Sequence, residues 1–261
     1  MHSPFIHKFQ PLYLKDFEMD KELVSLIQTL IEIDTLNILF VGDSGCGKTS
    51  IIQSIVREYY GGIIPDDNIL HINSLQDQGI SYYRSEVKTF CQTSSSVSGK
   101  KKMLILDDLD IINEQSQQVF RNCIDKYSHN VHFVASTSNT QKTIDSLQSR
   151  MTIVRVKALG QENLSRIMEK ICRAEDIKFT SAAKTFLLRV SSNSVRVLIN
   201  YLEKLKLIGQ DVTIDLVMAV CTNISFQEFA NYIGACRDPS GLRRAVGILY
   251  GLFDRGYSVM D

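Results

Sequence analysis

The chain has 261 residues, of which 44% are apolar, so it can bury a sizeable core and is long enough for one large domain with one or two small ones. Its formal net charge is zero, which excludes an overall excess of charge for binding polyanions and leaves nucleic-acid contact to local patches. The six cysteines form no C-x-x-C or close Cys/His pair, and no apolar run is long enough to span a membrane. We therefore expect no zinc site, no membrane partner, no signal peptide, and a reducing location in the nucleus or cytoplasm.

The first half of the chain alternates between strand-like and helix-like segments. Short apolar runs rich in strand formers predict strands at 37–41, 68–73, 102–108, 131–137 and 152–156. Apolar residues at helical spacing predict helices at 20–34, 51–60 and 81–92, and another that carries Val119, Phe120, Cys123, Ile124 and Tyr127 on one face. Strands separated by helices require crossover connections, so we predict an α/β fold with a parallel sheet covered by helices on both faces.

The second half reads as helices alone. Amphipathic helices are predicted at 160–176, 180–192, 194–209 and 213–222, with Thr180 and either Asp211 or Thr213 as caps. Two more are predicted at 226–238 and 241–258. The predicted domains are 1–157 (α/β), 158–222 (helical) and 223–261 (helical). Because two helices bury little, we expect the last segment to be truncated or completed by other chains.

A phosphate-binding motif follows the first predicted strand. The pattern G-x-x-x-x-G-K-[ST] is matched in full between a strand and a helix, as its mechanism requires. Its glycines let backbone N–H groups face phosphate oxygens, Lys48 is expected to neutralise the β- and γ-phosphates, and Thr49 to bind Mg²⁺. The expected nucleotide-binding residues of this P-loop are Gly42, Asp43, Ser44, Gly45, Cys46, Gly47, Lys48, Thr49 and Ser50. We interpret Cys46 as a small filler rather than a redox-sensitive group.

A second site is predicted at the end of the third strand, in "MLILDDLD". Asp107 ends an apolar strand at the sheet edge that carries the P-loop, so we expect it to hold Mg²⁺ through Thr49 or water. Asp108 is expected to polarise the attacking water. Its side chain is one methylene shorter than the glutamate common there in P-loop ATPases, and a general base must come within hydrogen-bond distance of its proton.

Several motifs in the same order resemble the AAA+ ATPases, specifically the small subunits of the replication factor C clamp loader. "HKFQP" is similar to the K-Y-R-P motif of that family, with Gln10 in place of arginine, and "NSLQDQGISYYRSEVKTF" to N-A-S-D-E-R-G-I-D-x-V-R-x-x-I-K-x-F. "ILDDLD" resembles I-L-D-E-A-D, "IDSLQSRM" resembles I-E-P-I-Q-S-R-C, and "SVRVLINYL" resembles M-R-x-A-L-N-x-L. The drifted motifs indicate a divergent lineage, cellular or viral.

The resemblance implies ATP and Mg²⁺ as ligands and assigns further residues. Arg150, which has no acidic residue within four positions on its C-terminal side, would be an arginine finger for the ATP of a neighbouring subunit. Ser138, with Asn139 beside it, takes the place of the sensor-1 asparagine. Arg196 matches the sensor-2 arginine, although "NS" replaces the usual Gly-Asp before it. Lys8 and Pro11 would border the nucleotide.

The same resemblance implies contact with DNA. Arg84 and Lys88 are one helical turn apart, and their counterparts in the family face the template backbone, where such contacts read phosphate rather than sequence. An ordinary solvated helix face is the alternative. The run Lys100 to Lys102 is interpreted as a solubilising flank of the third strand.

Two functional hypotheses follow from these residues. In the first, the chain is an ATPase subunit of a pentameric hetero-oligomer that opens a sliding clamp and loads it onto primer-template DNA. In the second, it binds nucleotide structurally and donates Arg150 to its neighbour with little turnover of its own. A less favoured third hypothesis is an AAA+ initiator or helicase loader.

Overall fold

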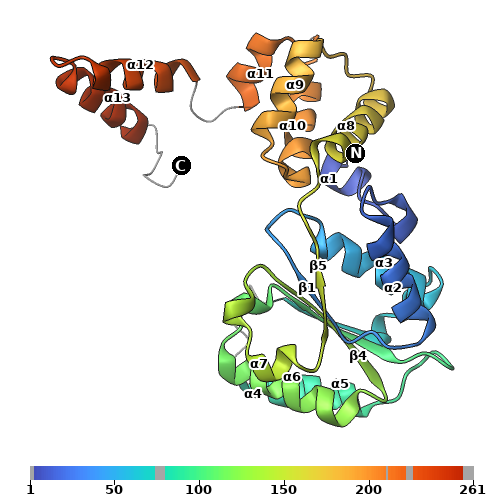
Figure 1. Cartoon of the computed structure of the whole chain (residues 1–261). Helices are drawn as coiled ribbons and strands as arrows, with labels where there is room; N and C mark the ends of the chain where they lie inside the picture. The colour runs from blue at the N-terminus through green and yellow to red at the C-terminus, as the bar shows by residue number, and fades with distance from the viewer. Residues whose placement is uncertain (1–2, 74–79, 210, 222–225, 255–261) are drawn as a thin grey trace. The chain divides into compact units, whose positions relative to one another are not determined.

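The computed structural model describes residues 3–73, 80–209, 211–221 and 226–254 (Figure 1). It divides into two compact units, one made of Met1–Ile167 with Asn193–Val197 and the other of Met168–Ser192 with Leu198–Asp261. Each unit is described by itself. The domain boundaries at 157 and 222 stay predictions.

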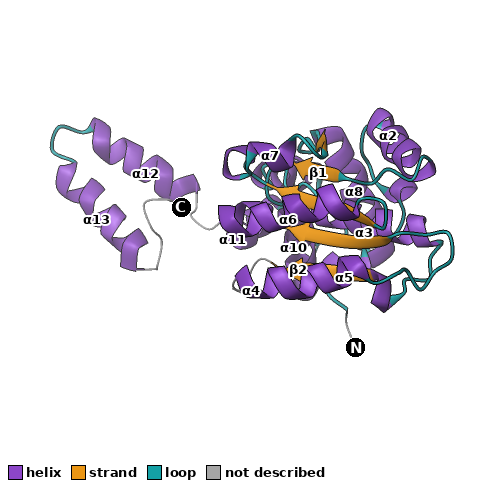
Figure 2. Cartoon of the chain, turned by 90° about the horizontal axis from the view of Figure 1, so that it is seen from below, coloured by secondary structure: helices purple, strands orange, loops and turns teal. Residues whose placement is uncertain are grey.

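The first unit is built on a five-stranded sheet in the order β2-β3-β4-β1-β5. The strands are β1 (Ile38–Val41), β2 (Ile69–Asn73), β3 (Lys102–Asp107), β4 (Val131–Thr137) and β5 (Thr152–Arg155). Every pair of neighbours is parallel, so the predicted parallel sheet is confirmed. Figure 2 shows this sheet enclosed by helices.

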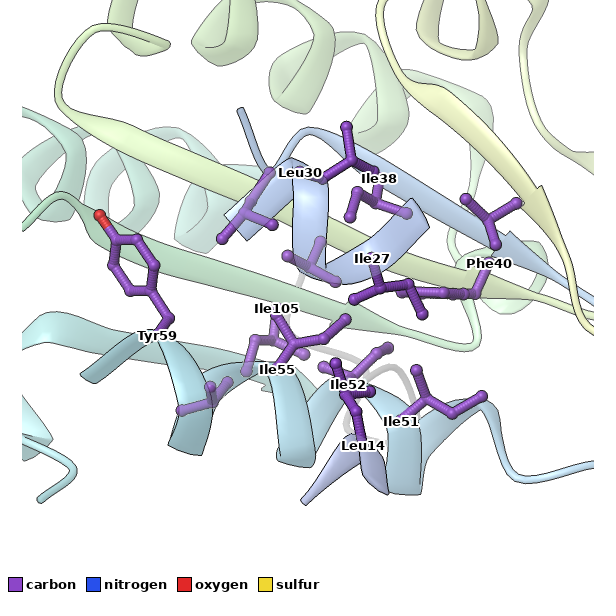
Figure 3. Packing of buried hydrophobic residues seen from close by; sticks show 14 of the residues in the cluster. Leu14, Ile27, Leu30, Ile38, Phe40, Ile51, Ile52, Ile55, Tyr59 and Ile105 are labelled. Atoms are coloured by element: carbon purple, nitrogen blue, oxygen red, sulfur yellow. The ribbon is translucent and has the colours of Figure 1, made fainter. Parts of the chain in front are cut away.

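Both faces of the sheet are buried. Successive side chains of a strand point to opposite faces, so the residues of β1 alternate between two core clusters. In β1, Ile38 and Phe40 join a cluster with Ile52 and Ile55 of α3 (Lys48–Tyr60), which Figure 3 shows from close by. Between them, Leu39 joins the cluster on the other face. A continuous apolar strand is what a sheet covered on both faces requires.

Helices complete the first unit. The face that carries Phe40 is covered by α2 (Lys21–Glu32) and α3, and short helices precede α2 at α1 (Phe5–Lys8) and η1 (Leu14–Asp16). The opposite face is covered by α6 (Glu114–Tyr127) and by a helical stretch of α4 (Ile80–Tyr82), a π-helical turn η3 (Tyr83–Val87) and α5 (Lys88–Gln92). Single turns lie at η2 (Asp66–Asn68), η4 (Leu109–Ile111), η5 (Thr140–Lys142) and α7 (Asp145–Gln148).

The second half is helical, as predicted. Its helices are α8 (Gln161–Glu175), α9 (Ser181–Val190), α10 (Val195–Ile208), α11 (Ile214–Cys221), α12 (Phe226–Arg237) and α13 (Leu242–Asp254). Thr180 caps α9 by accepting a hydrogen bond from the Ala183 N–H, and Thr213 does the same for α11 through the Leu216 N–H. Among the described residues, no helix is both long and apolar enough to cross a membrane.

The lysine run at 100–102 differs from its interpretation as a solubilising flank. Lys102 is buried, and its Nζ donates to the Phe90 carbonyl at 3.2 Å and to Thr93 Oγ1 at 2.5 Å. Lys101 pairs with Asp34 at 3.0 Å. These two lysines hold elements of the unit together, so solubility is the wrong account of them.

Candidate functional site

The predicted site residues meet at the carboxyl edge of the sheet. Val41, the last residue of β1, pairs with Thr137, the last residue of β4, and the backbone N–H of Gly42 donates to the Thr137 carbonyl at 3.2 Å. On the other side of β4, Leu106 of β3 pairs with Ala135. The loops after β1, β3 and β4 therefore leave the sheet side by side, where parallel α/β sheets bind ligands.

The P-loop has the backbone that phosphate binding requires. Gly47 has a φ of 98° and is the N-cap of α3. The loop therefore ends at a helix N-terminus, which carries a partial positive charge. A Cβ on Gly42 would lie 2.3 Å from the Val156 carbonyl oxygen, so only glycine fits there. Asp43 and Ser44 are exposed, whereas Cys46 is buried in the core as a filler.

The ammonium of Lys48 lies within this loop. Lys48 is buried, and its Nζ donates to the carbonyl oxygens of Gly42 at 2.7 Å and Asp43 at 3.0 Å. A buried ammonium that donates to the carbonyls of a glycine-rich turn suits an anionic ligand. The residues present thus fit a nucleoside triphosphate.

Asp107 is held by two hydroxyl groups. Thr49 Oγ1 donates to its Oδ2 at 3.0 Å and the fully buried Ser136 donates to its Oδ1 at 2.5 Å. A carboxylate beside a P-loop threonine hydroxyl is the oxygen donor set that Mg²⁺ prefers. Bound Mg²⁺ would offset the charge of phosphate oxygens at this position.

Asp108 has an unusual backbone. Its φ of 52° and ψ of 54° are left-handed, a conformation that aspartate tolerates better than most residues, and its N–H donates to Ser136 Oγ at 3.0 Å. Burial raises the pKa of its carboxyl above the usual value, and the charges of Asp107 and Asp110 raise it further. A carboxyl with a raised pKa is a better proton acceptor than an ordinary surface aspartate.

The loop after β4 presents Ser138. Its hydroxyl is exposed at the edge and donates to Asp110 Oδ2 at 2.6 Å. Asn139 caps η5 instead, because its Oδ1 accepts from the Gln141 N–H at 2.9 Å. Of the two residues predicted at sensor 1, Ser138 is the one whose side chain is hydrogen-bonded to the loop after β3.

The start of α10 lies against the P-loop within the first unit. A Cβ on Gly45 would lie 2.7 Å from Ser194 Oγ and 3.7 Å from Arg196 Cβ. The positive charge of Arg196 acts to lower the pKa of Asp108 against the larger effects that raise it. Asn193 has a φ of 60°, and asparagine tolerates this left-handed conformation, which accounts for its presence where the family has glycine.

The N-terminal segment reaches α3 through Gln10. The Gln10 side-chain amide donates to Ser50 Oγ at 3.4 Å and to Gln53 Oε1 at 2.5 Å. Lys8 is exposed and Pro11 half-buried on either side of it. The segment that resembles the family's entry to the nucleotide therefore lies beside the residue that follows Thr49.

The chain is similar to known proteins over the domain that carries this site. Residues 38–159 match the profile described as "ATPase family associated with various cellular activities (AAA)". These residues form an AAA ATPase domain.

The chain is 26% identical over 259 residues (99% of this chain, 80% of the other) to a protein of Acanthamoeba polyphaga mimivirus named as a replication factor C small subunit. It is 27% identical over 220 residues (84% and 68%) to the replication factor C small subunit of Methanoculleus marisnigri.

Solved structures share the fold. The RuvB Holliday junction branch migration motor of Thermotoga maritima superposes with a TM-score of 0.63 at 14% identity, covering 92% of this chain and 85% of RuvB. At this identity the likeness establishes the AAA fold alone.

The AAA domain gives Arg150 a local partner that the sequence did not reveal. Its Nε donates to Asp125 Oδ1 of α6 at 2.5 Å, and its Nη1 donates to the Ser146 carbonyl at 2.6 Å. Arg150 is therefore held by an acidic residue that lies 25 positions away in the sequence. Among the described residues, Nη2 has no hydrogen-bond partner, and the side chain is 29% exposed.

Arg150 lies far from the P-loop of its own AAA domain. It lies two residues before β5, and Thr152 of β5 pairs with Ile38 at the start of β1, whereas the P-loop follows the end of β1. Arg150 is therefore at the amino edge of the sheet and the P-loop at the carboxyl edge. If it contacts a nucleotide, that nucleotide belongs to another chain.

The predicted DNA-contacting residues, Arg84 and Lys88, are both exposed on the stretch from α4 to α5. The π-helical turn Tyr83–Val87 lies between them, a feature often found at functional sites. The preceding residues of the resembling segment, at 74–79, lie outside the described residues. Glu86, also exposed, dilutes the positive charge of this face.

Three residues that sequence reasoning did not assign support the site. They are Ser136, which bonds both Asp107 and the Asp108 N–H, Asp110, which accepts from Ser138, and Asp125, which binds Arg150. A serine within the apolar strand 131–137 was a detectable signal for the first. The other two depend on contacts between distant segments.

Proposed function

We propose that the chain is an ATP-binding and ATP-hydrolysing subunit of a clamp loader that opens a sliding clamp and loads it onto primer-template DNA. The AAA domain and the similarity to replication factor C small subunits support this function. The observation that carries the proposal is the position of Arg150, a partly exposed cation at the sheet edge opposite to the P-loop of its own chain. Such an arrangement suits a subunit that completes the site of its neighbour.

Each ATP site is then formed by residues of two adjacent subunits. Lys48 and the P-loop N–H groups bind the phosphates, while Thr49 and Asp107 hold Mg²⁺. Asp108 takes the proton of the attacking water. Arg150 of the neighbour stabilises the charge that develops on the γ-phosphate oxygens, and Arg196 contacts the phosphates from α10.

The last helices favour assembly with other chains. The helices α12 and α13 expose large apolar side chains, among which Leu242 is 75% and Phe253 69% exposed. The others are Phe229, Ile233, Val246, Leu249 and Tyr250. Apolar surface of this density on two helices marks a contact with protein, and we assign it to neighbouring subunits of a hetero-oligomer, a pentamer by the resemblance.

DNA contact is proposed for Arg84 and Lys88, which can bind phosphate groups from one helical stretch. Replacing both with glutamine should weaken DNA binding uniformly across sequences and reduce its dependence on salt.

A second function is favoured by Asp108. Its short side chain starts from a left-handed backbone, so it reaches less far than a glutamate would. In that case the chain binds ATP, donates Arg150 to the next subunit and turns over little ATP itself.

One experiment separates these functions. DNA-stimulated ATP hydrolysis is measured in the assembled complex for wild type, Lys48→Ala and Arg150→Ala. The hydrolytic function predicts that each substitution lowers turnover, because each removes one half of a working site. Turnover that survives Lys48→Ala but is lost with Arg150→Ala establishes the structural function. Turnover unaffected by either substitution rejects both.

A further inference from the structure

Two cysteines of the first unit form a pair that the proposed function does not use. Cys91 lies on α5 and Cys123 on α6, two helices that pack together over the same face of the sheet (Figure 1). Both residues are free cysteines, and their thiols are hydrogen-bonded to each other. The two sulfur atoms are therefore adjacent, as the formation of a disulfide requires.

The hydrogen bond between the thiols makes them chemically unequal. Cys91 donates its proton to the sulfur of Cys123, and this bond together with burial raises the pKa of Cys91. The same bond lowers the pKa of Cys123, against the opposing effect of burial. Because the thiolate is the nucleophilic form of cysteine, Cys123 is the reactive member of the pair. Cys123 is also 5% exposed, whereas Cys91 is fully buried, so an oxidant reaches Cys123 first.

Positive charges from three elements surround the pair. Lys126 of α6 and Lys88 of α5 help to lower the pKa of Cys123. Lys102 of β3, which is itself buried, acts in the same direction on Cys91. A thiolate at this position is thus stabilised from both helices and from the sheet.

Two cysteines of the second unit show the contrast. Burial raises the pKa of both Cys172 and Cys221 to about 11, so both stay protonated at neutral pH. Protonated thiols react slowly with oxidants, because the thiolate carries the reaction.

We infer that Cys91 and Cys123 form a redox-sensitive pair that hydrogen peroxide converts to a reversible disulfide between α5 and α6. The Cys123 thiolate attacks one peroxide oxygen, the O–O bond breaks, and a sulfenic acid and the first water are produced. The sulfur of Cys91 then attacks the sulfur of Cys123, so that an S–S bond replaces the S–O bond. The Cys91 proton leaves in the second water. Two thiols are oxidised, one peroxide is reduced to two waters, and an added dithiol reverses the change.

The disulfide would act on a helix that is already fixed at its end. The Cys91 carbonyl accepts a hydrogen bond from Asn130 Nδ2 at 2.9 Å, and Lys102 Nζ donates to the Phe90 carbonyl at 3.2 Å. A covalent bond to α6 adds to these contacts. In a reducing location such a disulfide is transient and senses oxidation rather than stabilising the fold permanently. This thiol chemistry depends neither on ATP nor on DNA.

The test treats the folded, full-length chain with hydrogen peroxide. The remaining thiols are then alkylated in denaturant, and the modified peptides are identified by mass spectrometry. Wild type should give a Cys91–Cys123 disulfide that dithiothreitol reverses. Cys236→Ser, which removes an exposed thiol from α12, is the control and should form the same disulfide. Oxidation of Cys236 and Cys172 while Cys91 and Cys123 stay reduced overturns the inference.

The same treatment in urea tests whether the fold brings the two sulfur atoms together. Unfolded protein should lose the preference for this pair. An equal yield of the Cys91–Cys123 disulfide in urea contradicts the inference, since the pairing would then need no native structure.

Single substitutions test the unequal roles of the two thiols. Cys91→Ser should accumulate a sulfenic acid on Cys123, which dimedone traps, and should form no disulfide. Cys123→Ser should protect Cys91 from oxidation, because Cys91 is the buried thiol. The opposite result for the two variants overturns the assignment. If either variant does not fold, brief labelling of wild type with peroxide and dimedone decides: label on Cys123 supports the inference, and label on Cys91 contradicts it.

Discussion

Asp125 Oδ1 accepts a hydrogen bond from Arg150 Nε at 2.5 Å, which ties the segment before β5 to α6. Arg121 approaches the same carboxylate, with its Nε 3.5 Å from Oδ2. Because Nε and Nη1 of Arg150 are both held within its own chain, the guanidinium is oriented before any neighbour arrives. Orientation in advance is what makes a charged group effective in a transition state.

We therefore predict that Asp125→Ala lowers DNA-stimulated ATP hydrolysis in the assembled complex by about tenfold, since Arg150 loses its orientation. ATP binding to the isolated chain should not change, because Asp125 is at the other edge of the sheet. Glu32→Gln, which removes an exposed carboxylate from α2, is the control. A complex that hydrolyses ATP at the normal rate with Asp125→Ala shows that Arg150 needs no such partner.

Ser136→Ala should affect both stability and Mg²⁺ binding. The substitution leaves the Asp108 N–H without its acceptor and removes one of the two hydroxyl donors to Asp107. The free energy of unfolding should fall by about 1–3 kcal/mol, and Mg²⁺-dependent ATP binding should weaken. Denaturant unfolding and a Mg²⁺ titration of ATP binding measure the two effects. Ser128→Ala is the control, because Ser128 is exposed. Ala135→Ser is not a suitable control, because Ala135 is as fully buried as Ser136.

Asp108→Glu should raise ATP hydrolysis and lower stability at once. The longer side chain reaches farther toward the attacking water, while the left-handed backbone at this position suits aspartate better than glutamate and disfavours the variant by about 1 kcal/mol. Single-turnover hydrolysis and thermal unfolding are the measurements. A lower rate with unchanged nucleotide affinity would mean that the site is built around the shorter acid.

His132 should make stability depend on pH. Its Nδ1 accepts the Leu36 N–H at 3.4 Å and its Nε2 lies 3.0 Å from Asp34 Oδ1, so the folded protein holds a neutral ring. Burial lowers the pKa of His132, and the nearby Asp34 only partly offsets this. Because the unfolded chain binds the proton more readily, this contribution is present above the ordinary histidine pKa of 6.5 and is lost as the pH falls below it.

The test compares unfolding free energies at about pH 7.5 and about pH 5.5. The positive charges of Lys101 and Lys100, which also act on the ring, lower the pKa of His132 further. His132→Gln should flatten the decrease in stability, whereas the control His129→Gln, at an exposed position, should not. Parallel curves for wild type and His132→Gln contradict the prediction.

The fold and the P-loop could be predicted because their signals are local. Strand 37–41, the glycine motif and the following helix are contiguous, so periodicity and spacing predicted the strand and the helix on either side of the loop. The partner of Arg150 could not be found in this way, since Asp125 is on another helix and 25 positions away. Lys102 was misread for the same reason: its burial depends on the end of α5, which the lysine run itself does not indicate.

The two edges of the sheet give the subunit a polarity. With the nucleotide loop at one edge and Arg150 at the other, a contact that joins them places unlike surfaces together and cannot have two-fold symmetry. Chains joined in this way add head to tail, either closing into a ring or ending with one unmatched surface at each terminus. In an open arc, the number of complete sites is then one fewer than the number of subunits.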